Sequence, residues 1–204
     1  MRIHHVSRKL SFNVLPLLAA LLFLTLQSCK APTEGEIPRQ KELLTGRAWK
    51  ALGNLREGRN YFEAQPISSS EGLVMGGYAN GTHPLNGTPS RSCEIINADQ
   101  KTIMLAEAMN VAHAETVSLL TADSNVVILS GMSDNGILTP SCEMFERQTR
   151  SWRVVGTLLL ARRQHTALFI NTDEILVVGG RDGSEAITAS AEIFNIRTGR
   201  SRRV

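Results

Sequence analysis

The sequence lacks the usual signatures of an enzyme active site. It contains no glycine-rich phosphate-binding loop, no serine nucleophile elbow, and no cluster of histidines, cysteines and carboxylates at metal-ligand spacing. Aromatic residues make up only 5% of the chain, and no stretch interleaves them with basic residues, so nothing favours nucleic acid as a partner. We therefore expect no catalytic residue, no metal and no cofactor.

An excess of one charge is also missing once the N-terminus is set aside. The formal net charge is +3, and Arg2, Arg8 and Lys9 account for all of it. Of the 22 basic residues, 19 remain after these three, against 19 acidic residues. The basic character is therefore a property of the N-terminal segment and does not point to an acidic partner.

The N-terminal segment, from Met1 to Ser28, has the pattern of a signal peptide. A basic start is followed by an apolar run from Leu10 to Leu26, and positions 26–29 read Leu-Gln-Ser-Cys. This tetrad resembles the bacterial lipobox, which implies that Cys29 carries a lipid and becomes the mature N-terminus. A membrane-spanning anchor and ordinary secretion remain alternatives, but the run is only about the minimum length that spans a bilayer. We expect a lipid-anchored protein of the bacterial cell envelope, at the outer membrane or cell surface.

A short tether is expected between this anchor and the folded part. Residues 29–44 mix charges with Pro32, Gly35 and Pro38, a composition that does not pack. From residue 45 to residue 204 the pattern runs without a break, which predicts one domain.

That domain is built from repeats. Ala161–Ile170 and Ile175–Gly180 form a predicted β-hairpin with a polar turn between them. The same pattern recurs around Val117–Gly131 and, more loosely, from Arg59 to Gly77. Each hairpin is followed by a strand with a glutamate at 94, 143 or 192, so both steps are 49 residues. A period near 50 with four strands per unit is typical of a propeller blade.

A tryptophan marks the fourth strand of the repeat. Trp152 follows the glutamate strand of the second copy, and its equivalents are Trp49, Ile103 and Ser201. Helical spacing of leucines and alanines over residues 43–55 favours a helix there, but the match of Thr45–Gly53 to Thr149–Gly156 favours a strand.

Together the glycine pairs, the glutamate strand, the tryptophan and the Arg-x-x-His sequence resemble the kelch repeat and the related blades of galactose-oxidase-like propellers. The resemblance covers about Thr45 to Val204. It implies an all-β fold in which the strand of Arg162 lies innermost, the glycine-pair strand second, the Glu143 strand third and the Trp152 strand outermost. Galactose-oxidase-like enzymes bind copper through tyrosine and histidine, but neither Tyr61 nor Tyr78 has a histidine at a convincing position. The activity is therefore not carried over.

Residues that recur in every copy are interpreted as structural. His113 and His165, 52 residues apart, are assigned to the same blade position, with Phe62 as their equivalent in the first copy. The three repeated glutamates are expected to be structural, because a catalytic pair would break the repeat. Cys93 and Cys142 match Ala191, which predicts small buried residues that are too far apart for a disulfide, although a disulfide remains an alternative in an oxidising compartment.

The longest irregular loop, Tyr78 to Gly87, is the candidate binding site, since recognition residues gather on asymmetric loops. Its candidate contacts are Tyr78, Asn80, His83 and Asn86.

About three blades can be counted, at residues 59–105, 111–155 and 163–204. This predicts an incomplete ring, because propellers generally have at least four blades. The chain is then a truncated reading frame, a unit that completes its ring with a second copy or another chain, or an open arc of three blades.

Two functions follow from this interpretation. The first is a surface-anchored, non-catalytic module that binds a protein or a glycan. The second is a fragment of a carbohydrate-active or galactose-oxidase-like enzyme whose active residues lie in other blades.

Overall fold

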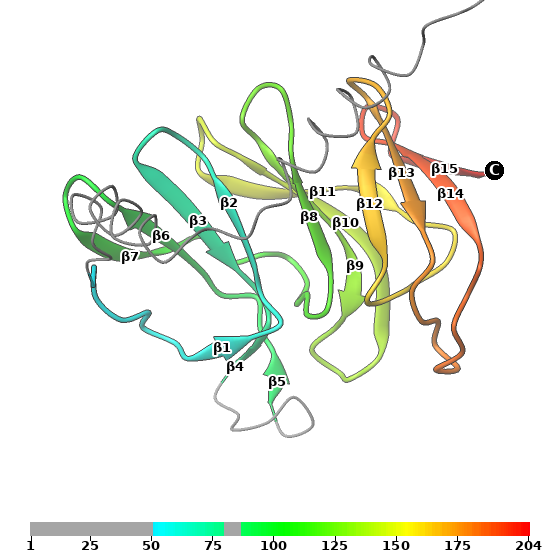
Figure 1. Cartoon of the computed structure of the whole chain (residues 1–204), viewed down its shortest axis with the longest axis horizontal. Helices are drawn as coiled ribbons and strands as arrows, with labels where there is room; N and C mark the ends of the chain where they lie inside the picture. The colour runs from blue at the N-terminus through cyan, green and yellow to red at the C-terminus, as the bar shows by residue number, and fades with distance from the viewer. Residues whose placement is uncertain (1–50, 80–86) are drawn as a thin grey trace, which may run out of the picture. The chain divides into compact units, whose positions relative to one another are not determined.

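The computed structural model describes residues 51–79 and 87–204, which form antiparallel β-sheets and no helix (Figure 1). Three sheets have four strands each, and a fourth, small sheet has three. Each four-stranded sheet is a propeller-type blade with its strands in chain order. The predicted all-β fold with about three four-stranded blades is confirmed.

The strand bounds show where the blades lie in the sequence. The first blade consists of β2 (Glu63–Pro66), β3 (Glu71–Met75), β6 (Cys93–Asn97) and β7 (Thr102–Ala106). The second consists of β8 (Val117–Leu120), β9 (Val126–Met132), β10 (Leu138–Glu146) and β11 (Ser151–Thr157). The third consists of β12 (Thr166–Phe169), β13 (Glu174–Val178), β14 (Ala191–Asn195) and β15 (Arg200–Arg203). The small sheet consists of β1 (Arg59–Asn60), β4 (Tyr78–Ala79) and β5 (Thr88–Pro89).

The first hairpin differs from its prediction. The innermost strand of the first blade is β2, which begins at Glu63, whereas Arg59 and Asn60 pair with Ala79 and Tyr78 in the small sheet. The third hairpin has the predicted form. Its turn is closed by Asn171 Oδ1, which accepts hydrogen bonds from the backbone N–H groups of Asp173 and Glu174.

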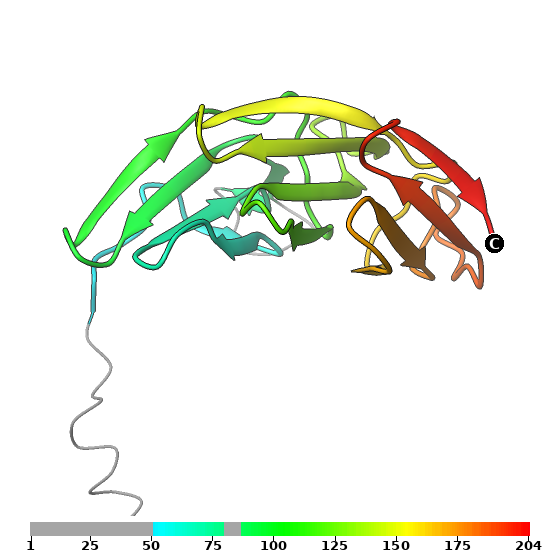
Figure 2. The same cartoon turned by 90° about the horizontal axis from the view of Figure 1, so that it is seen from above.

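Neighbouring blades meet through their inner strands, and the second and third blades also meet through their outermost strands, β11 and β15. Strand β2 contacts β8, and β8 contacts β12, so the blades lie side by side in chain order (Figure 2). Strand β9 is buried along nearly its whole length, since it is the second strand of the middle blade and has a neighbour on each face. This burial explains why Val126–Leu129 is a continuous apolar run instead of an alternating one.

Two hydrophobic clusters fill the gaps between blades. Trp152, packed against Phe145 with ring centroids 5.3 Å apart, belongs to the cluster between the first and second blades. In the second blade Trp152 pairs with Phe145 across the strands. Ile103 pairs with Ile96 in the first blade and Ser201 with Phe194 in the third, so both occupy the register position of Trp152. The prediction that Trp152 fills an interblade gap, and the assignment of Ile103 and Ser201 as its equivalents, are confirmed.

The last glycine of each hairpin lies close to a backbone carbonyl of the segment just before the inner strand. Gly180 has a φ of 92°, and a Cβ there would stand 2.5 Å from the Arg163 carbonyl oxygen. Gly77 and Gly131 are equally confined, by the carbonyls of Asn60 and Ala114. A side chain does not fit at these positions.

Several predictions concern residues outside the described ranges. The signal peptide, Cys29, the tether, Trp49 and most of the strand proposed for residues 45–53 are among them; within that strand, residues 51–53 have no regular secondary structure. No helix of the described residues is long and apolar enough to cross a membrane.

Candidate functional site

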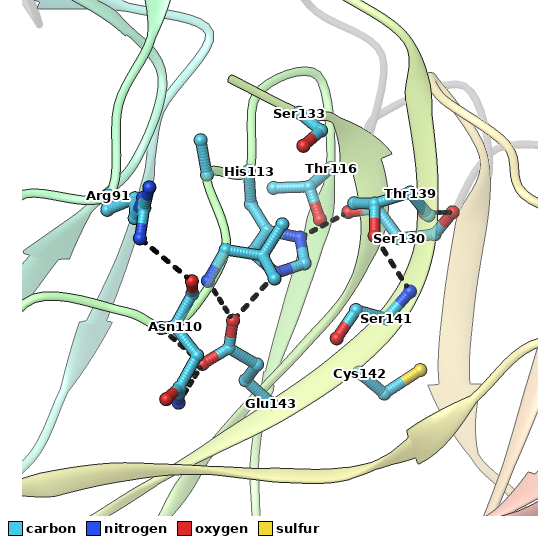
Figure 3. A network of polar contacts seen from close by, with 12 residues as sticks. Arg91, Asn110, His113, Thr116, Ser130, Ser133, Thr139, Ser141, Cys142 and Glu143 are labelled. Atoms are coloured by element: carbon cyan, nitrogen blue, oxygen red, sulfur yellow. Dashed lines mark hydrogen bonds and ion pairs between the residues drawn. The ribbon is translucent and has the colours of Figure 1, made fainter. Parts of the chain in front are cut away.

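A buried glutamate in the third strand of each blade fastens the segment that enters that blade. The Glu143 carboxylate accepts the backbone N–H groups of Asn110 at 2.8 Å and Val111 at 2.7 Å (Figure 3). Glu94 and Glu192 repeat this arrangement with Arg56 and Glu57, and with Leu159 and Leu160. These contacts satisfy the buried carboxylates and support the structural role predicted for them.

An arginine completes the arrangement in the first and third blades. Arg162 Nη2 lies 2.9 Å from Glu192 Oε1, and Nη1 donates to the carbonyls of Gly179 and Ser190. The equivalent arginine, Arg59, makes the same contacts with Glu94, Gly76 and Ser92. Both ion pairs are almost completely removed from solvent.

His113 takes the arginine position in the second blade. Its Nδ1 lies 2.7 Å from the Ser130 carbonyl oxygen, and its Nε2 faces Glu143 Oε1 at 3.4 Å (Figure 3). Burial would raise the pKa of Glu143, but hydrogen bonds from His113, from the Asn110 side chain and from two backbone N–H groups hold that pKa below its usual value. Glu143 is therefore charged at neutral pH.

The predicted equivalence of His113 and His165 is wrong. His113 is equivalent to Arg162, one repeat period further on, whereas His165 lies against the second glycine of its hairpin. The residues in that place are Phe62, Thr116 and His165. The two histidines are 52 residues apart, whereas the repeated glutamates are 49 residues apart. Residues one glutamate period apart occupy equivalent positions in the fold, so the two histidines do not.

Three loops just before the inner strands carry non-glycine residues in the left-handed backbone conformation. The φ angles are 50° at Tyr61, 51° at Glu115 and 53° at Gln164. The N–H of Glu115 donates to the Tyr61 carbonyl, and the N–H of Gln164 donates to the Glu115 carbonyl. Backbone hydrogen bonds thus connect Tyr61, Glu115 and Gln164, one residue from each blade, and we call these three residues the backbone string. Such conformations cost about 1–3 kcal/mol each and gather at ligand sites.

The side chains around the middle member of this string form a polar cluster. Tyr78 Oη donates to Glu115 Oε1 at 2.7 Å, and Arg163 Nη1 and Gln164 Nε2 each donate to Glu115 Oε2 at 2.6 Å. We call Tyr78, Glu115, Arg163 and Gln164 the Glu115 cluster. Its members come from the loops of two blades and from the small sheet, so only the assembled fold creates it.

Burial and charge set the protonation of the cluster. Burial, and then the hydrogen bond to Glu115, raise the pKa of Tyr78 well above its usual value, so this phenol remains a proton donor. Burial would lower the pKa of Arg163, but hydrogen bonds to Glu185 and Glu115 raise it. The cluster is therefore an ion pair between Arg163 and Glu115, to which Tyr78 and Gln164 donate hydrogen bonds.

The outer rim of the cluster is open to solvent. The ring of Tyr61 is edge-on to that of Tyr78, with centroids 6.3 Å apart, and Tyr61 is 51% exposed. Arg163 reaches from the buried Glu115 to Glu185, whose side chain is 61% exposed. An exposed aromatic ring and a planar guanidinium thus border the same buried carboxylate cluster.

Only part of the predicted binding loop can be placed. Tyr78 is buried in β4 and its hydroxyl donates to Glu115, so it holds the Glu115 carboxylate in position instead of facing solvent. Asn80, His83 and Asn86 lie outside the described residues. Cys93 and Cys142 are buried free thiols, as predicted, and burial raises the pKa of Cys93 to about 12.

Four residues of the site were missed by the sequence interpretation. They are Tyr61, Glu115, Arg163 and Gln164. A signal was present, because Tyr61, Glu115 and Gln164 are separated by the same two steps as the last glycines of the three hairpins. Their residue types differ, however, so a search for recurring types passes over them. No group of residues in the described ranges could hold a metal ion.

Comparison with known proteins supports the fold alone. No family model and no curated protein matches the chain. Among solved structures, "Structure of YjhT" aligns with a TM-score of 0.64 and 12% sequence identity. The alignment covers 77% of this chain and 55% of that chain. The chain thus spans about half the length of this structural neighbour.

Proposed function

We propose that the chain is a lipid-anchored protein of the bacterial cell envelope whose kelch-type blades bind a glycan without catalysing a reaction. The observation that carries this proposal is the Glu115 cluster, with its strained backbone string and exposed aromatic rim. Hydrogen bonds between the blades hold this string, and they place Tyr61 and Gln164 on either side of Glu115.

The chemistry of the rim fits a sugar better than a protein surface. Tyr61 offers an exposed ring on which the C–H face of a sugar can stack. Glu185, whose side chain is 61% exposed, offers a carboxylate acceptor for hydroxyl groups, and Arg163 holds that carboxylate in place because its two Nη atoms pair with Glu115 and Glu185. A few placed polar groups beside an aromatic surface are what orients a small polar ligand.

The same contacts favour binding over catalysis. Both oxygens of the Glu115 carboxylate already accept hydrogen bonds, and Arg163 balances its charge. Because the pKa of Tyr78 is raised, its hydroxyl is a donor and not a base. A general acid or base would need a free proton-transfer position, which this carboxylate does not offer.

The anchor part of the proposal is based on residues 26–29. Each buried methylene of a lipid contributes about 0.8 kcal/mol, so the two or more acyl chains expected at Cys29 would hold the protein at a membrane. The blades would then face the envelope space or the cell exterior, where glycans are found.

Binding can be tested with the full chain in detergent on an array of immobilised neutral and acidic oligosaccharides. Arg163→Gln and Tyr61→Ala should each weaken binding about tenfold or more, since the first releases the Glu185 acceptor from its ion pair and the second removes the stacking ring. Arg153→Gln is the matched control, because Arg153 forms a similar ion pair, with Glu146, at the outer edge of the second blade.

Three results would contradict the proposal. The first is an absence of binding to any oligosaccharide, and the second is an equal loss in the Arg153→Gln control. Chemical conversion of a bound oligosaccharide is the third, and it would favour the alternative of an enzyme fragment.

A further inference from the structure

One position of the repeat holds a titratable residue in the third blade and none in the other two. The residue that lies against the last glycine of the hairpin is Phe62 in the first blade, Thr116 in the second and His165 in the third. Phe62 has no polar group in its side chain, and the Thr116 hydroxyl donates to the Leu129 carbonyl at 2.8 Å. Both ring nitrogens of His165 are buried, and neither has a hydrogen-bond partner among the described residues. The third blade alone of the three therefore places here a group that can take up a proton.

The place that His165 occupies suits a neutral ring and disfavours a charged one. The residue is 5% exposed, and its Cα and Cβ lie against the backbone at Gly180. Burial, and then the charge of Arg162, lower the pKa of His165 to about 4. A protonated imidazole has two N–H donors, and in the described part of the chain neither meets an acceptor. Protonation therefore favours a conformation in which the ring has left this place.

The charged groups on the surrounding elements do not offset a charge on His165. Glu192 of β14 already pairs with Arg162. Glu115 of the second blade and Glu185 of the β13–β14 loop both pair with Arg163. Arg181, whose backbone exchanges two hydrogen bonds with that of Arg163, adds a further positive charge. A proton on His165 thus enters a region in which each of these carboxylates already has a partner.

The two residues that precede His165 make the third-blade contacts of the Glu115 cluster. Gln164 donates its backbone N–H to the Glu115 carbonyl at 2.8 Å and its Nε2 to Glu115 Oε2 at 2.6 Å. Arg163 Nη1 donates to the same carboxylate oxygen, also at 2.6 Å. Because Gly180 lies against the backbone of His165, moving the ring into solvent displaces residues 163–165 as a unit. These contacts with Glu115 then break together.

The backbone of the same segment is already strained. Gln164 has a φ of 53°, in the left-handed region that residues with a side chain adopt at a cost in free energy. An open segment recovers this cost. The strain therefore favours opening at Gln164, whereas the hydrogen bonds to Glu115 and the backbone pair between Arg163 and Arg181 oppose it.

We propose that His165 is an acid-sensitive switch for the Glu115 cluster. As the pH falls, the ring takes up a proton and leaves its buried place, and Arg163 and Gln164 separate from Glu115. Glu115 keeps its contacts with Tyr61 and Tyr78, so the cluster parts at the boundary between the second and third blades. Release of a bound ligand in acid follows from the proposed function and rests on it, but the opening itself does not.

Hydrogen exchange of single backbone amides in the full chain in detergent tests the switch without any ligand. The protection factor is measured, because it removes the direct effect of pH on amide exchange. An exposed histidine titrates at 6.5 and the buried one at about 4, so the protection of the Gln164 amide should fall about twentyfold between pH 7 and pH 5. The Glu115 amide, which donates to the Tyr61 carbonyl, is the internal control and should keep its protection.

Two variants show whether His165 causes the change. His165→Phe and His165→Thr introduce the residue types that the first and second blades carry at this position, and neither takes up a proton. The protection of the Gln164 amide should be the same at both pH values in each variant. A ring and a hydroxyl fill the place differently, so either variant that folds is sufficient. An effect of acid on the Glu115 carboxylate itself would persist in both variants.

Three results would overturn the proposal. They are a Gln164 amide with equal protection at the two pH values, an equal fall in a folded His165→Phe or His165→Thr variant, and an equal fall at the Glu115 amide, which would indicate general loosening. A failure of the proposed function is seen separately. Loss of protection at Gln164 in a chain that binds no oligosaccharide would remove the glycan and support the switch.

Discussion

At the scale of single residues, the buried ion pairs are the most sensitive points of the fold. Glu192 and Arg162 pair at 2.9 Å with side-chain exposures of 2% and 1%. Removing one member of such a pair leaves an uncompensated charge, whereas an exposed pair contributes little.

Glu192→Gln should therefore lower the free energy of unfolding by about 3–5 kcal/mol, because Arg162 would remain charged in the interior. Glu146→Gln, which removes an exposed partner of Arg153, should change it by less than about 0.5 kcal/mol. Urea denaturation of both variants measures the difference. Similar losses in the two would show that the repeated glutamates are not buried anchors.

His165 should make the stability depend on pH. Burial, and then the charge of Arg162, lower the pKa of His165 from 6.5 to about 4, and neither ring nitrogen has a hydrogen-bond partner. The unfolded chain therefore binds a proton between these pH values while the folded chain does not. The contribution of neutral His165 to the free energy of unfolding is fully present above pH 6.5. It decreases as the pH falls toward 4, by about 3 kcal/mol in total.

His165→Phe places the residue of the first blade, Phe62, at the equivalent position. The variant should lose this decrease between pH 6.5 and pH 4, as measured by urea denaturation at several pH values. An unchanged slope in the variant would mean that His165 is protonated in the folded protein.

At the scale of elements, the outer strands differ in how firmly they hold their blades. Strand β11 carries Trp152 into the cluster between the first and second blades, whereas β15 has Ser201 at that register position. The serine hydroxyl donates to the Thr157 carbonyl of β11, which is a smaller contact than a buried indole.

Trp152→Ala should lower the free energy of unfolding by about 3–5 kcal/mol, because it removes a large buried side chain and leaves a cavity. Val154→Ala on the same strand should cost less than about 0.5 kcal/mol, since Val154 is 52% exposed. Thermal or urea unfolding distinguishes the two. An equal cost would mean that the cluster re-packs around the missing indole.

At the scale of the whole molecule, the proposed anchor decides where the blades act. Cys29→Ala removes the thiol that the lipid requires, so the protein should move from the membrane fraction to the soluble fraction. Detergent phase partitioning of the wild type and the variant measures this change. Cys93→Ala is a suitable control, because that thiol is buried in the first blade and should not affect partitioning. Retention of the Cys29→Ala variant in the detergent phase would exclude lipid anchoring at this residue.

The sequence by itself determined the number of blades, the four strands of each and the burial of Trp152, Cys93 and Cys142, and the order of the strands was implied by the resemblance to kelch blades. These features are local or periodic: apolar runs define strands, the polar turn at Asn171–Glu174 defines a hairpin, and the constant step between the glutamates aligns the copies. Trp152 could be assigned to an interblade gap for the same reason, since a large apolar residue at a fixed place in a repeat has to be buried.

Only the tertiary structure decided which side chains meet between blades. Glu115 and Arg163 are far apart in the sequence and lie in different blades, and their contact depends on the relative position of two loops. The left-handed backbone of Tyr61, Glu115 and Gln164 likewise follows from hydrogen bonds between blades, because these residue types do not favour it locally. The exchange of Arg162 for His113 was hidden for a related reason: a buried carboxylate accepts either side chain, so the contact is kept while the residue type changes.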